Sequence, residues 1–448
     1  MVQIGLRLFR QITLANTSVT ASMQTLLMNM GVVLLNMLTG MLIARGLGAD
    51  GRGVHAAILL WPQFLAFLLN MGIHSAALYE SKRQQPGKDL FTGALLLSSG
   101  ASCAAMGIGY VLLPMILHHY DSATIRYAQY MLFVIPMLHL SFLVQAMLRS
   151  MNRFGLYNLT RISVPLLTAI GLGLCLWLDA FRPSYTVLSY FLPYAPIFLY
   201  LGYRMYRQLP GTLRGLRASI RKLTSYGMRC SGHEMLGTAS LYADQLLVAF
   251  LLSPSALGLY VVAVSLARMV NIFSNSIIMV LFPKASGLAK AEVVRMTLTA
   301  FRLNVLVMLV GGSVIILLAP WFLSLLYGAD FAGAVTVFRL LVLEVMLTES
   351  GMVLAQAFMA LNLPGRVSWL QAIGFGTSLP LMWWWIQGYG IHGAALGLLC
   401  AAVVKWLYLI VQYRRCFGVG LKQYGFQKED YVAVKRLLRK YRVKGVSS

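Results

Sequence analysis

Residues 20–44 read TASMQTLLMNMGVVLLNMLTGMLIA, a run of 25 residues without a charged side chain. The run gives way to the glycine-rich segment RGLGADGRG at 45–53, and a second apolar run follows at 54–79. A helix that crosses the hydrocarbon core of a bilayer needs about 20 largely apolar residues. Two such runs around a short turn therefore predict a pair of membrane-spanning helices.

Similar apolar runs recur along the whole chain. We predict twelve helices, at about 20–44, 54–79, 91–117, 126–148, 162–178, 187–206, 226–252, 258–282, 296–319, 334–361, 367–386 and 391–413. The predicted fold class is an all-α polytopic membrane protein with about 12 transmembrane helices. The predicted parts are an N-terminal cytoplasmic or interfacial segment (1–19), a six-helix bundle (20–206), a basic cytoplasmic linker (207–225), a second six-helix bundle (226–413) and a basic cytoplasmic tail (414–448).

The composition excludes a soluble or a disordered protein. Of the 448 residues, 59% are hydrophobic and 11% are charged, and the mean hydropathy is +0.73. Soluble domains carry about 25% charged residues, and disordered chains are poor in aliphatic residues. The net charge of +24 is compatible with nucleic-acid binding or with charged loops of a membrane protein, and the positions of the charges decide between the two.

The basic residues favour one face of the predicted membrane domain. With the N-terminus inside, 29 of the 37 Lys and Arg residues fall on the cytoplasmic face, four fall outside and four lie within spans. Cytoplasmic loops of membrane proteins are enriched in Lys and Arg. We therefore expect a multi-pass protein with both termini in the cytoplasm. The tail is expected to lie on the anionic inner leaflet, and nucleic acid is not an expected partner.

The two halves of the chain share short patterns. Residues 47–55 read LGADGRGVH and residues 252–260 read LSPSALGLY, so that Leu and the last Gly align between the two predicted hairpins. Likewise, Gln145-Ala146 precedes Asn152, and Gln356-Ala357 precedes Asn362. Internal repeats are common in transporters, and the substrate binds between the repeats. The halves are therefore predicted to form two pseudo-symmetric bundles.

Several segments resemble the polysaccharide transporter branch of the multidrug/oligosaccharidyl-lipid/polysaccharide exporter superfamily, which includes the bacterial polysaccharide flippases. They are IARGLGADGRGVHAA at 43–57, DQLL at 244–247, LGLY at 257–260, LFPK at 281–284 and GYGIHGAA at 388–395. The resemblance covers about residues 15–415. His55 is a departure, because the family usually has Tyr there. The resemblance implies two six-helix bundles around a central cavity and a location in the bacterial cytoplasmic membrane.

Ionisable residues inside a bilayer are costly, so they tend to face a cavity or a partner. Five polar or small residues of the predicted helix 226–252 fall on one face: Arg229, His233, Gly237, Ser240 and Asp244. Four residues of the predicted helix 258–282 form a second stripe: Ser265, Arg268, Asn271 and Asn275. Both stripes have the periodicity of walls around a watered cavity.

Asp244 and Arg268 are about equally far from the turn near residue 255, so we expect them at similar depth. Two interpretations stay open, a buried ion pair between two helices and a cavity site in which Arg268 meets an anionic headgroup. Arg302 is a further cavity candidate. In the first predicted hairpin, Asn29 lies at the same depth as Asn70, and Asn36 at the same depth as Gln63. For both pairs, a hydrogen bond between the amide side chains of the two helices is favoured over ligand binding.

Signatures of catalysis are absent from the sequence. It contains no GxxxxGK[ST], HExxH or GxSxG pattern and no paired-cysteine pattern. The five cysteines are widely spaced and are interpreted as small apolar residues. We therefore predict no enzyme activity, no catalytic residue, no cofactor and no metal.

The predicted function is a flippase that moves a polyprenyl-diphosphate-linked oligosaccharide between leaflets by alternating access. A cation-coupled multidrug exporter of the same superfamily is the alternative, disfavoured because the first six predicted helices hold no carboxylate deep in a span. A membrane polysaccharide polymerase or glycosyltransferase is less favoured, because every predicted external loop is short. As an exporter, the protein would have the lipid-linked oligosaccharide as its substrate and the polymerase and glycosyltransferases of the same pathway as partners.

Overall fold

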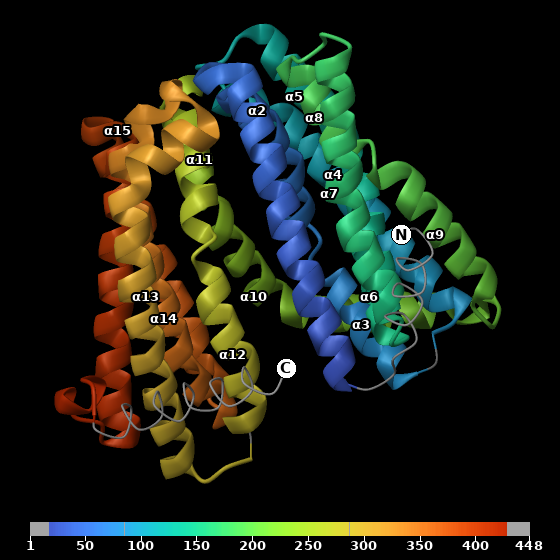
Figure 1. Cartoon of the computed structure of the whole chain (residues 1–448). Helices are drawn as coiled ribbons and strands as arrows, with labels where there is room; N and C mark the ends of the chain where they lie inside the picture. The colour runs from blue at the N-terminus through green and yellow to red at the C-terminus, as the bar shows by residue number, and fades with distance from the viewer. Residues whose placement is uncertain (1–17, 85, 286, 428–448) are drawn as a thin grey trace, which may run out of the picture. The chain divides into compact units, whose positions relative to one another are not determined.

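The computed structural model describes residues 18–84, 86–285 and 287–427, and every regular element in these ranges is helical (Figure 1). Within a bilayer, a helix satisfies its own backbone hydrogen bonds. The α-helices are α2 (Ser18–Leu68), α3 (Ile73–Arg83), α4 (Lys88–Ile116), α5 (Ser122–Met131), α6 (Ile135–Ser150), α7 (Phe154–Trp177), α8 (Pro183–Phe191), α9 (Tyr194–Gln208), α10 (Leu216–Leu251), α11 (Pro254–Arg268), α12 (Asn271–Ala285), α13 (Lys290–Tyr327), α14 (Val335–Ala360) and α15 (Pro364–Phe417). The 3₁₀ turns are η1 (Leu132–Val134), η2 (Leu213–Gly215), η3 (Ala329–Ala334) and η4 (Leu421–Tyr424).

The all-α membrane fold is confirmed. Eight helical stretches of the described residues are long and apolar enough to cross a membrane. The longest, Pro364–Phe417, has 54 residues. At about 1.5 Å per residue it is about 80 Å long, more than twice the thickness of a hydrocarbon core. The count of twelve spans and the pseudo-symmetry of two bundles stay predictions.

Two of these stretches bend sharply at a glycine. Gly48 interrupts α2 with φ 67° and ψ −174°, and Gly390 interrupts α15 with φ 56° and ψ −135°. A side chain at positive φ is strained, and glycine avoids that strain. The bends lie between the predicted spans 20–44 and 54–79, and between 367–386 and 391–413. Each long helix thus corresponds to two predicted helices joined without a loop.

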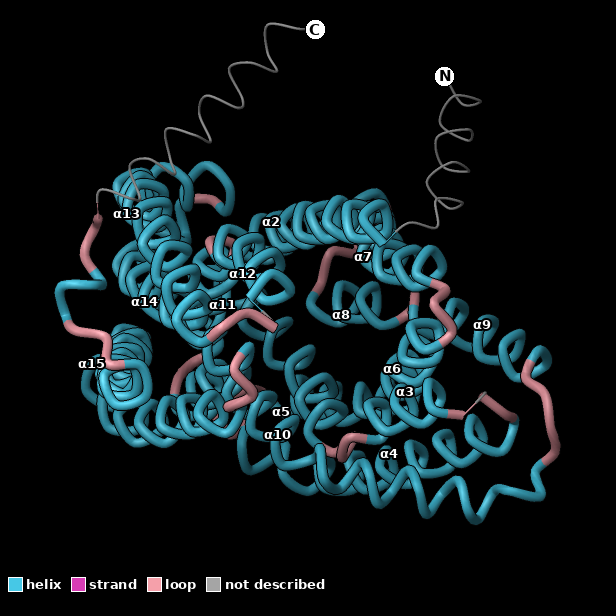
Figure 2. The backbone as a smooth tube through the Cα atoms, turned by 90° about the horizontal axis from the view of Figure 1, so that it is seen from below, coloured by secondary structure: helices cyan, strands magenta, loops and turns pink. Residues whose placement is uncertain are grey.

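Four predicted helices are broken in the structure, and one of them, 126–148, divides into α5 and α6 around the 3₁₀ turn η1. The predicted span 54–79 ends as α2 at Leu68 and resumes as α3, because Met71 and Gly72 adopt left-handed conformations with φ 47° and 71°. The span 187–206 divides into α8 and α9 at Pro193, whose ring lacks a backbone donor. The span 258–282 divides into α11 and α12. Figure 2 draws the connections between helices of the described chain as pink loop segments.

The predicted linker 207–225 is largely helical. α10 begins at Leu216, ten residues before the predicted start of its span. Between the end of α9 and this residue, the chain is irregular except for the 3₁₀ turn η2. Asp89 at the start of α4 holds this region, since it accepts a 2.8 Å hydrogen bond from Ser219 Oγ. Residues 1–17 and 428–448 lie outside the described residues. They make up most of the predicted N-terminal segment and most of the predicted basic tail.

The described chain forms two compact units. Unit 1 holds the described residues up to Val262 together with Leu326–Phe331, and unit 2 holds Ala263–Leu325 and the described residues from Ala332 onward. Each unit has an apolar core. The core of unit 1 includes Phe198 and Met147, and that of unit 2 includes Tyr413 and Phe358, all at most 1% exposed.

Large apolar side chains also cover the outside of the helices. Trp177, Leu317 and Trp384 are between 75 and 80% exposed. Large apolar side chains exposed to this degree suit contact with lipid. Together with the long apolar helices, this surface is that of a multi-pass membrane protein.

Candidate functional site

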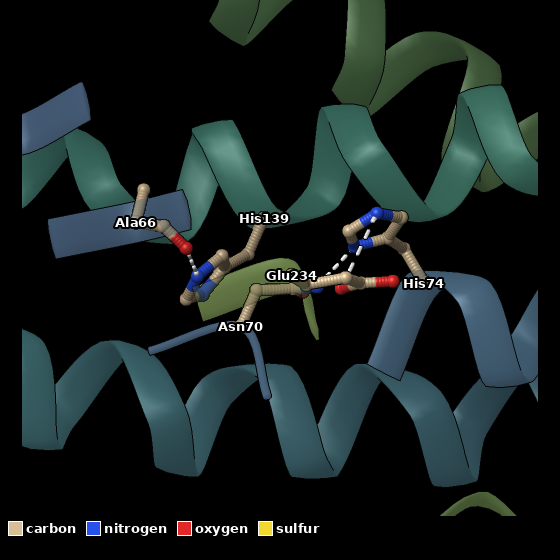
Figure 3. Close-up of polar contacts among 5 residues, drawn as sticks. All are labelled: Ala66, Asn70, His74, His139 and Glu234. Carbon is tan, nitrogen blue, oxygen red and sulfur yellow. Dashed lines mark hydrogen bonds and ion pairs between the residues drawn. The ribbon is translucent and has the colours of Figure 1, made fainter. Parts of the chain in front are cut away.

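In unit 1, a histidine and a glutamate from different helices lie in contact. His74 Nε2 on α3 lies 3.9 Å from Glu234 Oε2 on α10, and the two side chains are 23% and 22% exposed. Asn70, just before α3, is hydrogen-bonded to His74 Nδ1 (Figure 3). This contact couples α3 to α10.

His139 on α6 lies beside this pair and is fully engaged. Its Nε2 lies 2.8 Å from the carbonyl oxygen of Ala66 (Figure 3), and its Nδ1 lies 2.7 Å from Ser102 Oγ and 3.1 Å from the carbonyl oxygen of Ser98. The side chain is 1% exposed. His139 therefore ties α6 to α2 and α4, and a structural role is the direct interpretation.

Aromatic rings pack against the same polar group. Phe142 lies with its ring centroid 5.9 Å from that of His74 and 6.2 Å from that of His139, and it stacks on Phe67 at 4.5 Å. Tyr242 on α10 lies 6.3 Å from Phe67. The His74–Glu234 pair thus sits against an apolar wall, which strengthens charge interactions by excluding water.

The predicted stripe on α10 is only partly buried. Arg229 and Gly237 are exposed, Ser240 donates to the carbonyl oxygen of Leu236 in its own helix at 2.8 Å, and the side chain of His233 lies outside the described residues. Asp244 is 2% exposed and accepts a 3.3 Å hydrogen bond from the hydroxyl of Tyr260 on α11. The spacing of polar residues along the sequence predicts that Asp244 is buried. It does not predict that Tyr260 is the hydrogen-bond donor to Asp244.

In unit 2, the second predicted stripe crosses a break in the helix. α11 ends at Arg268 and α12 begins at Asn271, so that the two residues flank the turn at 269–270. The backbone N–H groups of Met269 and Val270 bond three residues back, to Leu266 and Ala267, at 3.1 Å. Ser265 and Asn275 are exposed and Arg268 and Asn271 are half-buried. Asp244 and Arg268 belong to different units, and their pairing stays a prediction.

A polar chain joins three helices in the core of unit 2. Ser274 on α12 donates to Asn304 Oδ1 on α13 at 2.9 Å, and Asn304 donates to Ser350 Oγ on α14 at 3.2 Å. All three residues are at most 3% exposed. Each buried polar group thereby has a partner, which is how a membrane helix bundle tolerates such groups.

Carboxylates and a lysine cluster between α14 and α15 of unit 2. Lys405 donates to Thr348 Oγ1 at 2.9 Å, and Thr348 donates to Glu344 Oε1 at 2.6 Å. Glu349 lies near enough to interact electrostatically with both Glu344 and Lys405. Two acids and one base in a membrane segment are costly, and such groups mark ion or proton pathways by default.

The three remaining predicted residues have other surroundings. Asn29 accepts a 2.6 Å hydrogen bond from Arg161 on α7, and Asn70 bonds His74, so the expected amide pair of Asn29 with Asn70 is replaced by these two contacts. Asn36 is exposed, and its carbonyl oxygen accepts from Thr39 at 3.0 Å. Arg302 is 3% exposed and donates to the carbonyl oxygen of Gln423 at 2.8 Å.

Within the described ranges, no group of three or more His, Cys, Asp or Glu side chains is placed to hold a metal ion.

Comparisons with known proteins agree with this architecture. Residues 15–289 match the family described as polysaccharide biosynthesis protein. The structure resembles "Lipid II flippase MurJ, inward closed conformation", with a TM-score of 0.74 and 14% identity over 96% of this chain and 93% of that one. No curated protein sequence matches the chain significantly.

Multidrug transporters of the MATE family have the same fold. An inward-facing MATE transporter of the MOP superfamily aligns with a TM-score of 0.66 and 15% identity over 86% of this chain and 95% of that one. MATE in complex with MaL6 aligns with a TM-score of 0.61 and 15% identity over 89% and 97% of the two chains. The family match covers more than half of the chain, and the fold is that of MOP superfamily transporters. The chain therefore belongs to the polysaccharide biosynthesis protein family.

Proposed function

We propose that this protein is a flippase that translocates a polyprenyl-diphosphate-linked oligosaccharide, the repeat unit of a cell-surface polysaccharide. Membership of the polysaccharide biosynthesis protein family and the likeness of the fold to a lipid II flippase support the proposal. The charge asymmetry of 29 basic residues to four favours a location in the bacterial cytoplasmic membrane with both termini inside. The expected neighbours in the pathway are the polymerase and the glycosyltransferases.

The break between α11 and α12 is the observation that carries the proposal. Arg268 closes α11, and α12 starts three residues later, so a basic residue shortly precedes a helix N-terminus in the chain. The N-terminus of a helix carries partial positive charge. In α12 this charge remains although the N–H groups of Ile272 and Phe273 bond to the carbonyl oxygens of Met269 and Val270. Discontinuous membrane helices supply such termini to anionic substrates in transporters. A diphosphate is the group that this positive charge suits.

The remaining polar residues of the same helices suit the sugar portion. Ser265 and Asn275 are exposed, and Asn271 is half-buried next to the break. Hydroxyl and amide groups donate to and accept from sugar hydroxyls without a charge. In an alternating-access cycle of two six-helix bundles, such uncharged hydrogen bonds would hold the sugar weakly enough for it to be released on the other side.

A cation-coupled multidrug exporter is the second candidate. The cluster of Glu344, Glu349 and Lys405 favours it, because carboxylates in a membrane segment attract cationic drugs or coupling ions. The MATE structures align with this chain less closely than the flippase does, with TM-scores of 0.66 and 0.61 against 0.74. The flippase is therefore our conclusion.

Leaflet-resolved transport in proteoliposomes tests the proposal. Purified protein should speed the translocation of a polyprenyl-diphosphate oligosaccharide, and Arg268→Gln should slow it by about tenfold or more, since a charged hydrogen bond contributes about 1.5–3 kcal/mol. Arg126→Gln is the matched control, because Arg126 is exposed on α5 and lies in no predicted span interior. Export of organic cations without any lipid translocation would replace the flippase by the second candidate.

A further inference from the structure

Two pockets lie at corresponding places in the two halves of the described chain. In unit 1, a pocket of about 160 Å³ lies between the start of α7 and the last turns of α9, which belong to the fifth and sixth predicted helices. In unit 2, a pocket of about 630 Å³ lies between the start and the last turns of α15, which belong to the eleventh and twelfth. Neither pocket is lined by residues of α11 or α12, so both are separate from the break between those helices.

The same pair of side chains is found in both pockets. Arg153 Nη1 donates to Gln208 Oε1 at 3.0 Å in unit 1, and Arg366 Nη1 donates to Gln412 Oε1 in unit 2. All four residues line their pockets. Each arginine comes within four residues of the asparagine that closes the preceding helix with a positive φ. The two halves therefore repeat one arrangement, an arginine at a helix start held by a glutamine at a helix end.

Each guanidinium keeps donors for a ligand. An arginine side chain has five N–H donors, and the glutamine oxygen accepts from one nitrogen of each. That oxygen is neutral, and none of the residues that line either pocket is acidic. The pocket of unit 1 has a second arginine, Arg204. Both pockets therefore suit an anion, and phosphate oxygens match the planar fork of an arginine.

Exposed apolar side chains form part of the rim of both pockets. Leu156 in unit 1 is 39% exposed, and Leu363 and Trp369 in unit 2 are 38% and 67% exposed. A small soluble anion gains little from such a rim, whereas the glycerol and acyl chains of a lipid can pack on it. Tryptophan is also enriched where membrane proteins meet the headgroup region. The lining thus suits a phospholipid with its phosphate inside the pocket and its chains outside.

The predicted topology places these residues at the inner surface of the membrane. Arg153, Arg204 and Arg366 are among the 29 basic residues of the predicted cytoplasmic face. The cytoplasmic leaflet is the one that carries anionic lipids, and juxtamembrane basic residues attract them. The phosphates of that leaflet are therefore at the depth of both pockets.

We propose that the two pockets bind the headgroup phosphates of anionic phospholipids of the inner leaflet, one in each unit. The guanidinium of Arg153 or Arg366 donates to the phosphate, while its glutamine fixes the orientation of the guanidinium. The bound lipid connects α7 to α9 in unit 1 and the start of α15 to its end in unit 2, and so stabilises both units. This role goes beyond the proposed transport function, because the lipid is resident and not transported.

Thermal unfolding of the full chain in nanodiscs tests the proposal. The nanodiscs contain phosphatidylcholine alone, phosphatidylcholine with a small fraction of phosphatidylglycerol, or phosphatidylcholine with glycerol 3-phosphate in the buffer. A ligand that binds only the folded protein raises its Tm. We expect a rise with phosphatidylglycerol and none with glycerol 3-phosphate, because the soluble ester has no chains for the apolar rim.

The double variant Arg153→Gln/Arg366→Gln should weaken lipid binding at each site about tenfold or more, since a hydrogen bond to a charged group contributes at least that factor. It should therefore lose most of the rise in Tm, measured against the same variant in phosphatidylcholine. Each single variant should lose part of the rise, and the two losses should add, because the two arginines share no partner in the described chain. Arg153→Lys/Arg366→Lys keeps the charge without the planar fork and should retain part of the rise. It replaces the Gln variant if that variant does not fold.

Arg217→Gln/Arg415→Gln is the matched control. It removes one exposed basic residue from each unit, on the same predicted face and outside both pockets. The net charge falls by the same amount as in the Arg153/Arg366 variant. The control should keep the rise in Tm with phosphatidylglycerol.

Four outcomes overturn the proposal: no rise in Tm with phosphatidylglycerol, a rise with glycerol 3-phosphate alone, an undiminished rise in the folded Arg153/Arg366 variant, or an equal loss in the Arg217/Arg415 control. The second would mean that a soluble phosphate ester occupies the pockets. The last would mean that general surface charge attracts the lipid. Failure of the transport assay would leave this test unaffected.

Discussion

Gly53 in α2 and Gly258 in α11 lie against each other's backbone. A Cβ on Gly53 would lie 1.6 Å from the carbonyl oxygen of Pro254, and a Cβ on Gly258 would lie 2.0 Å from that of Ala49. These are the glycines that share a position when the segments 47–55 and 252–260 are aligned. The sequence pattern thus marks a crossing of two helices that only glycine permits.

Alanine at either position should destabilise the protein. Gly53→Ala and Gly258→Ala place a methyl group against backbone, which cannot move aside as a side chain can, and overpacking costs about 1–3 kcal/mol. Thermal unfolding in detergent should show a lower Tm for both. Gly107→Ala is the control, because a Cβ there meets nothing within 4 Å and Ala favours helix. Equal Tm values for Gly53→Ala and Gly107→Ala would refute the tight crossing.

Asn152 and Asn362 end α6 and α14 with the same backbone conformation, φ 55° and 57°. In both turns the next residue, Arg153 or Leu363, bonds five residues back, at 2.9 and 2.7 Å. Glycine is tolerated in this conformation and β-branched residues are not. We expect Asn362→Gly to keep the Tm and Asn362→Val to lower the stability by about 1–2 kcal/mol. A Val variant as stable as the Gly variant would contradict the prediction.

The contact of His74 with Glu234 should be measurable as a coupling energy. A double-mutant cycle of His74→Gln and Glu234→Gln compares the unfolding free energies of wild type, both single variants and the double variant. A charged pair exists only when the imidazole is protonated. The coupling energy should therefore be larger at about pH 5.5 than at about pH 8. An equally small coupling energy at both pH values would show that His74 and Glu234 pack together without forming a charged pair.

Asp121 caps α5 by accepting from the backbone N–H of Thr124 at 3.3 Å. Hydrogen bonds from Thr124 lower the pKa of this exposed carboxyl below its ordinary value. The contribution of this cap to the free energy of unfolding is therefore complete above the ordinary pKa of an aspartate. It is lost as the pH falls through the lowered pKa of Asp121. Asp121→Ala should cost about 1 kcal/mol at neutral pH. The difference from wild type should shrink in acid, and Asp121→Asn should retain most of the cap.

The helical architecture follows from the apolar runs, because in a bilayer such a run has few alternatives to a helix. The breaks are less accessible to sequence analysis. Pro193 signals one, but Met269 and Val270 are ordinary membrane residues, and nothing local marks their turn. The start of α10 at Leu216 was also missed, since its first turns are basic and carry no apolar signal.

The site depends on contacts between distant segments, which spacing along one helix cannot give. Periodicity indicates that Asp244 is buried, but His74 and Glu234 meet although they are far apart in sequence. Arg302 was a candidate for the transport cavity, and its described partners are Gln423 and Thr299, which make it an anchor for the chain after α15. Its role in substrate binding stays a prediction.

α10 is 36 residues long but is not among the eight stretches that are apolar enough to cross a membrane by composition. It packs against α2, α3 and α4, which are made earlier during synthesis. A helix carrying Arg229, Glu234 and Asp244 partitions poorly into lipid by itself. We therefore expect the insertion of α10 to depend on packing against these earlier helices.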